Sequence, residues 1–259
     1  MRIALGVEYN GAKYCGWQYQ DHSPSVQQCV EQALSQVADH SVRVHCAGRT
    51  DTGVHGLGQV IHFDTAAQRD PHSWVFGANA NLPDDISVQW AKLVDDSFHA
   101  RYSATSRIYR YVIFNRQVRP AVLAHRVSWD YRPLDVTRMQ AAAVHLVGEH
   151  DFSSYRAVAC QASSPVRHLF RLEIEQHGPL ISLELEANGF LHHMVRNIAG
   201  VLMTIGAGEA ELDWSREVLE HRDRTQGGIT APAEGLYFIG VRYPEQYGLP
   251  LLLSPVMVW

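Results

Sequence analysis

The sequence is poor in lysine, in paired cysteines and in long apolar runs. Its 22 basic residues include only 2 lysines, so arginine carries nearly all of the positive charge. The 4 cysteines form no C-x-x-C pair, which favours free thiols in a reducing compartment over a disulfide framework. The longest nearly apolar stretch, residues 198–208, is too short to span a bilayer, and the N-terminus lacks the apolar run of a signal peptide. We therefore expect a soluble cytoplasmic protein.

Motifs for nucleotides and metals are also missing. No G-x-x-x-x-G-K-[ST] or G-x-G-x-x-G loop occurs, and the 15 histidines include no H-E-x-x-H. His192 and His193 are adjacent, so on a helix their side chains would point about 100° apart and would chelate poorly. We therefore expect neither a metal ion nor a cofactor.

The arginines are distributed unevenly along the chain. The formal net charge of −5 argues by itself against a nucleic-acid partner, yet residues 101–132 hold seven arginines and a single acid, Asp130. A second basic stretch contains Arg156, Arg167 and Arg171 without an intervening acid. Guanidinium groups bind phosphate in a bidentate manner and stack on bases, so such patches suit RNA. The alternative is a surface whose charge is uneven without any such partner.

Apolar periodicity predicts a mixture of strands and helices. Alternation predicts strands over residues 2–9, 42–46, 59–63, 86–93, 107–114, 168–176, 180–187 and 236–243. Helical spacing predicts helices over residues 25–38, 136–147, 192–205 and 214–221. Ser25 is expected to cap the first helix in a capping box with Gln28, and Asp135 is expected to cap the second, which Gly148 closes.

This mixture predicts the α+β class. We expect two related halves, each with a mainly antiparallel sheet and helices on one face, sharing a central active-site cleft. The boundary is expected near Ala104, giving an N-terminal catalytic subdomain of residues 1–103 and a C-terminal subdomain of residues 104–259.

The densest motif is the run A-G-R-T-D-T-G-V-H-G at residues 47–56, which lies between two predicted strands. Gly48 and Gly53 flank Asp51 and allow a tight backbone course. Arg49 would keep the carboxylate of Asp51 ionised and available as a nucleophile. The structural alternative is an Asx turn, in which Asp51 accepts hydrogen bonds from downstream amides. Aspartic proteases also contain Asp-Thr-Gly, but they present it twice so that two carboxylates share a proton, and here it occurs once beside an arginine.

Residues 48–55 resemble the G-R-T-D-x-G-V-H signature of the TruA family of tRNA pseudouridine synthases. Further segments agree with the family pattern in order and spacing: residues 9–20 (Y-x-G-x-x-Y-x-G-W-Q-x-Q), 79–83 (NANLP), 98–101 (FHAR), 109–111 (YRY), 190–197 (FLHHMVRN) and 233–236 (AEGL). The similarity extends to near residue 243, whereas the tail at residues 249–259 matches no pattern that we assign.

The resemblance implies that uridine is isomerised to pseudouridine at positions 38, 39 and 40 of the tRNA anticodon stem and loop, without a cofactor. It implies that Asp51 is the nucleophile and that Arg196 is the basic residue paired with it. Tyr109 would stack on the target base, although a strand tyrosine is also an ordinary core residue. Leu236 would line the pocket beneath the base. Whether the aspartate attacks C6 of the uracil or assists cleavage at C1′ is left open.

The resemblance extends to the remaining site residues and to assembly. Arg49 would tune Asp51 and help to fill the space that the extruded base leaves. Arg110, within the basic stretch, is expected among the tRNA-binding residues. The family implies the anticodon arm as partner and a homodimer as the working form. The rival from another class is a non-enzymatic RNA-binding module, which would retain tRNA without forming product.

Overall fold

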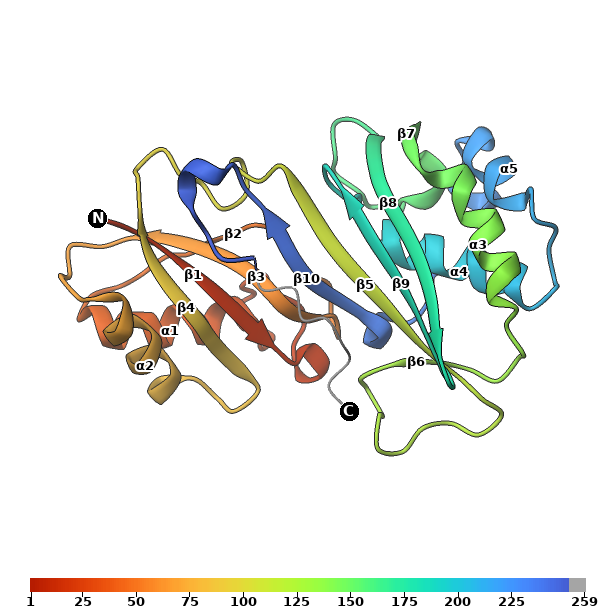
Figure 1. Cartoon of the computed structure of the whole chain (residues 1–259). Coiled ribbons are helices and arrows are strands. Elements are labelled where there is room, and N and C mark those ends of the chain that lie inside the picture. The colour runs from red at the N-terminus through yellow and green to blue at the C-terminus, as the bar shows by residue number, and fades with distance from the viewer. Residues whose placement is uncertain (252–259) are drawn as a thin grey trace. The chain divides into compact units, whose positions relative to one another are not determined.

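The chain forms two compact units in a computed structural model that describes residues 1–251. One unit contains Met1–Ser106 and the segment from Tyr237 onward, and the other contains Arg107–Leu236 (Figure 1). The boundary expected between residues 103 and 104 lies close to the position where the chain passes from the first unit to the second, between Ser106 and Arg107. The sequence did not predict that the segment from Tyr237 belongs to the first unit. This placement depends on the pairing of Tyr237 with His55, which is distant in sequence and which no local pattern indicates. Most of the tail at residues 249–259 lies outside the described residues.

The sheet of the first unit is built around two long strands. Strand β1 (Arg2–Tyr9) lies between β3 (His55–Asp64) and β4 (Ile86–Val94) and is antiparallel to both. Strand β10 (Leu236–Arg242) pairs with β3 in parallel, and the short β2 (His45–Cys46) pairs with β3 antiparallel. The predicted strands near residues 2–9, 59–63, 86–93 and 236–243 are therefore confirmed.

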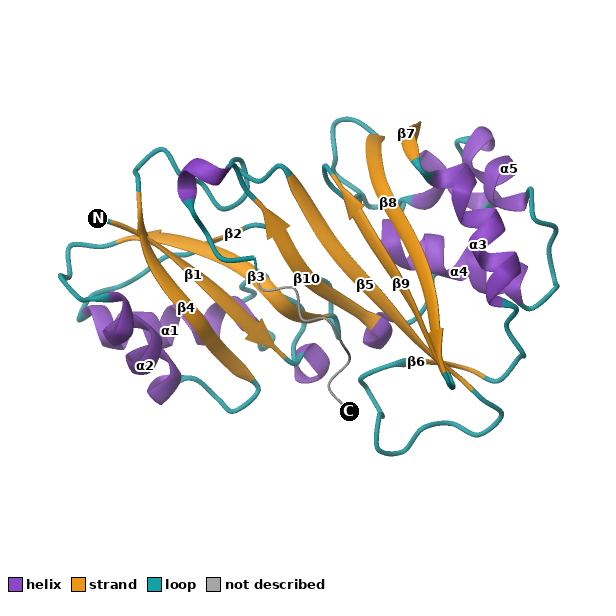
Figure 2. Ribbon diagram, viewed as in Figure 1, coloured by secondary structure: helices purple, strands orange, loops and turns teal. Residues whose placement is uncertain are grey.

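Helices α1 (Val26–Ala38) and α2 (Pro71–Asn81) pack side by side on one face of this sheet (Figure 2). The predicted cap is present, since Ser25 Oγ accepts a hydrogen bond from the amide of Gln28 at 3.3 Å. Buried apolar side chains from both layers form the core: Ile3, Leu5, Val7, Tyr9, Val30, Leu34, Phe63 and Trp74. Burial of this apolar surface is the main stabilising contribution to the unit.

The strand predicted over residues 42–46 is shorter than expected. Only His45–Cys46 pairs as a strand. The amide of Val42 donates instead to Ser35 Oγ at 2.9 Å, and that of Val44 donates to Glu31 Oε1 at 3.0 Å. Because side chains of α1 take these donors, the segment docks on the helix before it joins the sheet.

The strands of the second unit are mainly antiparallel. Its strand order is β5 (Ser106–Asn115), β9 (Leu180–Ala187), β8 (Val166–His177) and β7 (Gly148–Asp151), with β6 (Ser128–Asp130) parallel to β5. The predicted strands at residues 107–114, 168–176 and 180–187 are confirmed, and so is the α+β class. β6 and β7 were not predicted, since each is too short to show a period.

The unit has three α-helices: α3 (Val136–Ala143), α4 (Met194–Gly206) and α5 (Trp214–His221). Helix α3 packs against β8 and α4, and α5 packs against both of the other helices. The helix predicted over residues 136–147 ends earlier and continues as one 3-10 turn, Val144–Leu146. The helix predicted from residue 192 begins two residues later. Buried members of the core include Met139, Leu146, Leu183, Leu185, Ile198, Leu202 and Val218. No helix within residues 1–251 is long and apolar enough to cross a membrane.

Candidate active site

The loop that carries Asp51 enters β3 of the first unit and is fixed at its base. The amide of Ala47 donates to the carbonyl of Val60 at 2.8 Å. The buried side chain of Gln59 donates through Nε2 to the carbonyl of Gly48 at 2.6 Å. A side chain of β3 therefore holds the loop in a fixed conformation.

The N-terminal segment braces the same loop from the other side. The amide of Trp17 donates to the carbonyl of Thr50 at 3.0 Å, and the hydroxyls of Tyr9 and Thr50 lie 2.8 Å apart. The amide of Gly53 donates to the carbonyl of Tyr14 at 3.3 Å. The motif at residues 9–20 thus packs against the motif at residues 48–55. This contact gives a structural reason why both segments belong to the same family pattern.

Two glycines of the N-terminal segment make this close approach possible. A Cβ on Gly11 would lie 1.9 Å from the carbonyl oxygen of Val54. Gly16 has a φ of +89°, and a Cβ there would lie 2.5 Å from the carbonyl oxygen of Thr50. A side chain at Gly11 would displace the backbone at Val54, and one at Gly16 would displace the backbone from Thr50 to Thr52.

His55 locks the end of the loop. Its Nδ1 accepts a hydrogen bond from the amide of Gly11 at 3.1 Å, so this nitrogen carries no proton. The imidazole stacks on Tyr237, with ring centroids 4.7 Å apart and an interplanar angle of 23°. The sequence did not predict this structural role, because His55 appeared there only as the last residue of the motif at residues 48–55.

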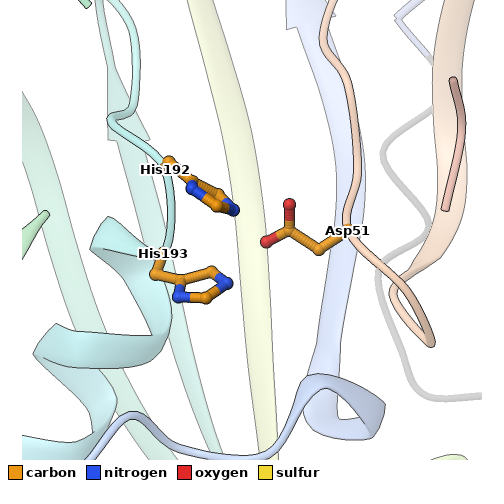
Figure 3. A group of neighbouring side chains, drawn as sticks. All are labelled: Asp51, His192 and His193. Carbon is orange, nitrogen blue, oxygen red and sulfur yellow. The ribbon is translucent and has the colours of Figure 1, made fainter. Parts of the chain in front are cut away.

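The catalytic candidate itself is accessible. Asp51 is half-buried and Arg49 is exposed on the same loop. The turn closes through the main chain, because the amide of Val54 donates to the carbonyl of Asp51 at 3.1 Å. Figure 3 shows Asp51 on the loop that leads into β3 and His192 and His193 on the segment that leads into α4.

The two histidines differ from the expectation for a helix. α4 begins at Met194, and His193 precedes it with a φ of 63°. The left-handed residue turns the chain, so the two rings lie together, with centroids 4.1 Å apart. The argument that a helix would point them apart was therefore wrong, although the expectation of no metal site rested on other grounds as well.

Tyr109 of the second unit lies on β5 opposite Leu185 of β9. Its side chain is almost buried, with 8% of the residue exposed. The ring meets Phe190 edge to face, with centroids 5.0 Å apart. Phe190 belongs to the FLHHMVRN segment, so two of the recognised motifs meet at this tyrosine. An edge-to-face neighbour fixes the plane of the ring, as a stacking residue requires.

Arg196 is anchored to the segment before β10. Its Nε donates to the carbonyl of Ala231 at 2.7 Å, and the amide of Ala231 donates back to the carbonyl of Arg196 at 3.2 Å. The hydroxyl of Tyr111 donates to the next carbonyl, that of Pro232, at 2.9 Å. Leu236 ends the same segment and is buried. Arg196 and Leu236 are thus tied to one stretch of backbone.

Arg110 has a structural partner. Its guanidinium pairs with Glu184, the residue opposite it on β9, at 2.8 Å, and only 12% of its side chain is exposed. Arg171 binds the other oxygen of Glu184. Placing Arg110 at the RNA surface therefore stays a prediction, and the stretch of residues 101–132 is not a uniform basic face.

The segments that carry these residues match the profile of a known protein family. The family profile described as tRNA pseudouridine synthase matches residues 6–103 and 142–244. The chain belongs to the tRNA pseudouridine synthase family. It is accordingly an isomerase that modifies tRNA.

Relatives named tRNA pseudouridine synthase A match nearly the whole chain. The protein of Pseudomonas aeruginosa is 58% identical over 250 residues, which cover 96% of this chain and 88% of the relative. That of Coxiella burnetii is 56% identical over 249 residues, covering 96% and 95%. That of Nitrosococcus oceani is 55% identical over 259 residues, covering all of both chains. A chain of the solved structure titled "Crystal Structure of a Cbf5-Nop10-Gar1 Complex" aligns with a TM-score of 0.35 at 12% identity, over 78% of this chain and 45% of that chain.

Proposed function

We propose that the chain converts uridine to pseudouridine at positions 38, 39 and 40 of the tRNA anticodon stem and loop, with Asp51 as the nucleophile. The observation that carries this proposal is the loop at residues 47–54. It holds a half-buried carboxylate beside an exposed arginine on a backbone braced from two sides. Such bracing is what a nucleophile needs, because an error of one ångström in its aim costs a large part of the rate.

The reaction conserves every atom of the substrate. The bond between C1′ and N1 breaks, the uracil rotates, a bond forms between C1′ and C5, and the proton lost from C5 is balanced by one gained at N1. The carboxylate of Asp51 either attacks C6 of the uracil or assists cleavage at C1′. The base must leave the stack to reach a carboxylate on a protein loop.

The second unit would supply three further groups. Tyr109 would stack on the flipped uracil with its ring plane set by Phe190. Arg196, anchored through Nε to the carbonyl of Ala231, would orient the nucleophile, and the buried Leu236 would line the pocket. Arg49 would help to fill the gap left in the RNA. A homodimer, cofactor-independence and a cytoplasmic location belong to the same proposal. The homodimer rests on the resemblance, cofactor-independence on the resemblance and the missing motifs, and the location on the sequence patterns described above.

The deciding experiment is an assay of pseudouridine in unmodified tRNA, read out position by position with carbodiimide. Wild-type protein is expected to form product at positions 38, 39 and 40, also after treatment with a chelator and in defined magnesium, which the tRNA itself requires for folding. Asp51→Asn is expected to retain fold and tRNA binding while its single-turnover rate falls by at least about 1,000-fold, because an amide cannot act as a carboxylate nucleophile.

A matched control removes a carboxylate elsewhere on the first unit. Asp39 is exposed and has a φ of 58°, a conformation that asparagine tolerates, so Asp39→Asn should leave the rate unchanged. Wild-type-like turnover by Asp51→Asn would remove Asp51 from its role. Retention of tRNA without product by the wild-type chain would favour the non-enzymatic RNA-binding module.

A further inference from the structure

A series of aromatic ring contacts runs from the interior of the first unit to its surface. His62 of β3 lies opposite His45 of β2, and their rings stack with centroids 5.0 Å apart. His62 also meets His99 at 4.6 Å, and His99 meets Tyr102 at 4.3 Å. His62 is 2% exposed, whereas Tyr102 is 76% exposed. The series of ring contacts therefore ends in an aromatic ring that is exposed to solvent.

The turn that carries Tyr102 is fixed by hydrogen bonds. Nδ1 of His99 accepts from the amides of both Arg101 and Tyr102, at 3.1 and 3.3 Å. The amide of His99 donates to Ser103 Oγ at 2.9 Å, and the amide of Ser103 donates to the carbonyl of His99, also at 2.9 Å. A ring presented by such a turn loses little conformational entropy on binding a partner.

An arginine lies against the ring of Tyr102. The guanidinium carbon of Arg101 lies 5.6 Å from the centroid of the Tyr102 ring. Arg101 and Arg49 also act on one thiol: burial raises the pKa of Cys46 to about 12, and both arginines oppose that rise. Arg101 and Arg49, which belongs to the loop that carries Asp51, therefore both lie within electrostatic range of Cys46.

We propose that Arg101 and Tyr102 form an accessory contact for the tRNA substrate, in which the ring stacks on an unpaired base and the guanidinium faces a phosphate. Every base has a π-face, so an exposed tyrosine beside an arginine suits RNA of any sequence, and the positive charge complements the backbone. The contact rests on the proposed function in taking tRNA as the ligand. It adds affinity and takes no part in the chemical step.

The test measures the affinity for unmodified tRNA at fixed ionic strength, with the single-turnover rate at saturating enzyme as a second readout. Tyr102→Ala is expected to weaken binding by about 10-fold, the usual effect of losing one base stack, at an unchanged saturated rate. Tyr102→Phe keeps the ring and should bind like wild type. Arg101→Ala should weaken binding and lower the slope of log K against log salt by about 1.

Matched controls use residues of the same kind on another element of this unit. Phe76 on α2 is 61% exposed, and Arg69 just before that helix is also exposed, so Phe76→Ala and Arg69→Ala should bind tRNA like wild type. Wild-type affinity of Tyr102→Ala overturns the proposal, and so does an equal loss in Tyr102→Phe. If sedimentation shows that Tyr102→Ala changes self-association at wild-type tRNA affinity, the surface serves a second copy of the chain and the RNA contact is refuted. Failure of the proposed function would instead appear as a wild-type chain that forms no pseudouridine.

Discussion

His62 is a buried histidine that the fold keeps neutral. Burial lowers its pKa from the ordinary 6.5 to about 3, and the neighbouring imidazoles of His99 and His45 act in the same direction. The neutral ring accepts the amide of Ala100 at Nδ1, at 3.1 Å. The unfolded chain takes up a proton near pH 6.5, while the folded chain resists it down to about pH 3. The stability gained from the neutral ring is therefore complete above pH 6.5 and is lost as the pH falls from 6.5 towards 3.

His62→Asn tests this account, because the amide oxygen can accept the same hydrogen bond without titrating. The variant is expected to be less stable at pH 7.5, by about 1–2 kcal/mol, since it loses ring packing. Its melting temperature should then fall less steeply than that of wild type between pH 6.5 and pH 4. Calorimetry across this range measures the melting temperatures. Parallel curves of melting temperature against pH for the two proteins would refute the account of His62.

At the same scale, the sequence pointed to candidates for the reactive residues but not to the residues that hold the loop in place. Asp51 and Arg49 stand out because their chemistry is visible in a single motif. The roles of Gly11 and Gly16 depend on how closely one backbone approaches another, and that of His55 depends on an amide 44 residues away. The spacing of residues along the sequence carries no information about such contacts.

Among the elements, α3 depends on a cap that local sequence predicts. Asp135 accepts hydrogen bonds from the amides of Thr137 and Arg138, at 2.8 and 3.2 Å. Asp135→Ala should lower the free energy of unfolding by about 1 kcal/mol, whereas Asp135→Ser should recover most of it. Urea denaturation of the two variants measures this, and pseudouridine formation below the transition should be unaffected. Equal stability of Asp135→Ala and wild type would show that the cap contributes nothing.

Helix α2 was not predicted from the sequence. Its apolar residues do not follow one stripe: Trp74 and Ala78 are buried, but Phe76 is 61% exposed. A search for helical periodicity therefore passes over it. The start signal was nevertheless present, with Asp70 capping the helix through the amide of Ser73 at 2.7 Å and Pro71 in its first turn. The elements that were predicted well, such as β1 and α1, bury one regular face and have recognisable ends.

Across the whole molecule, the arginines fall into two groups that the sequence does not separate. Arg110 and Arg171 share Glu184, and Arg132 pairs with Asp130 at 2.6 Å. These guanidinium groups are neutralised within the fold. Others, such as Arg119 in the connection between β5 and β6, are exposed. A net charge of −5 is compatible with RNA binding, because a phosphate backbone responds to local groups of exposed arginines and not to the total charge of the chain.

Salt dependence distinguishes the two groups. Each arginine that neutralises an RNA phosphate releases condensed counterions, so log K for tRNA should fall linearly with log salt. Arg119→Gln is expected to lower that slope by about 1 and to leave the melting temperature unchanged, since the residue is exposed. Arg110→Gln is expected to do the reverse, because it leaves Glu184 with one cation in place of two: the slope stays the same and the second unit loses about 1–3 kcal/mol of stability. Titrations of labelled tRNA between low and physiological salt, with thermal melts of the same preparations, give both quantities. A reduced slope in Arg110→Gln at wild-type stability would mean that the ion pair opens on tRNA binding and that Arg110 contacts phosphate.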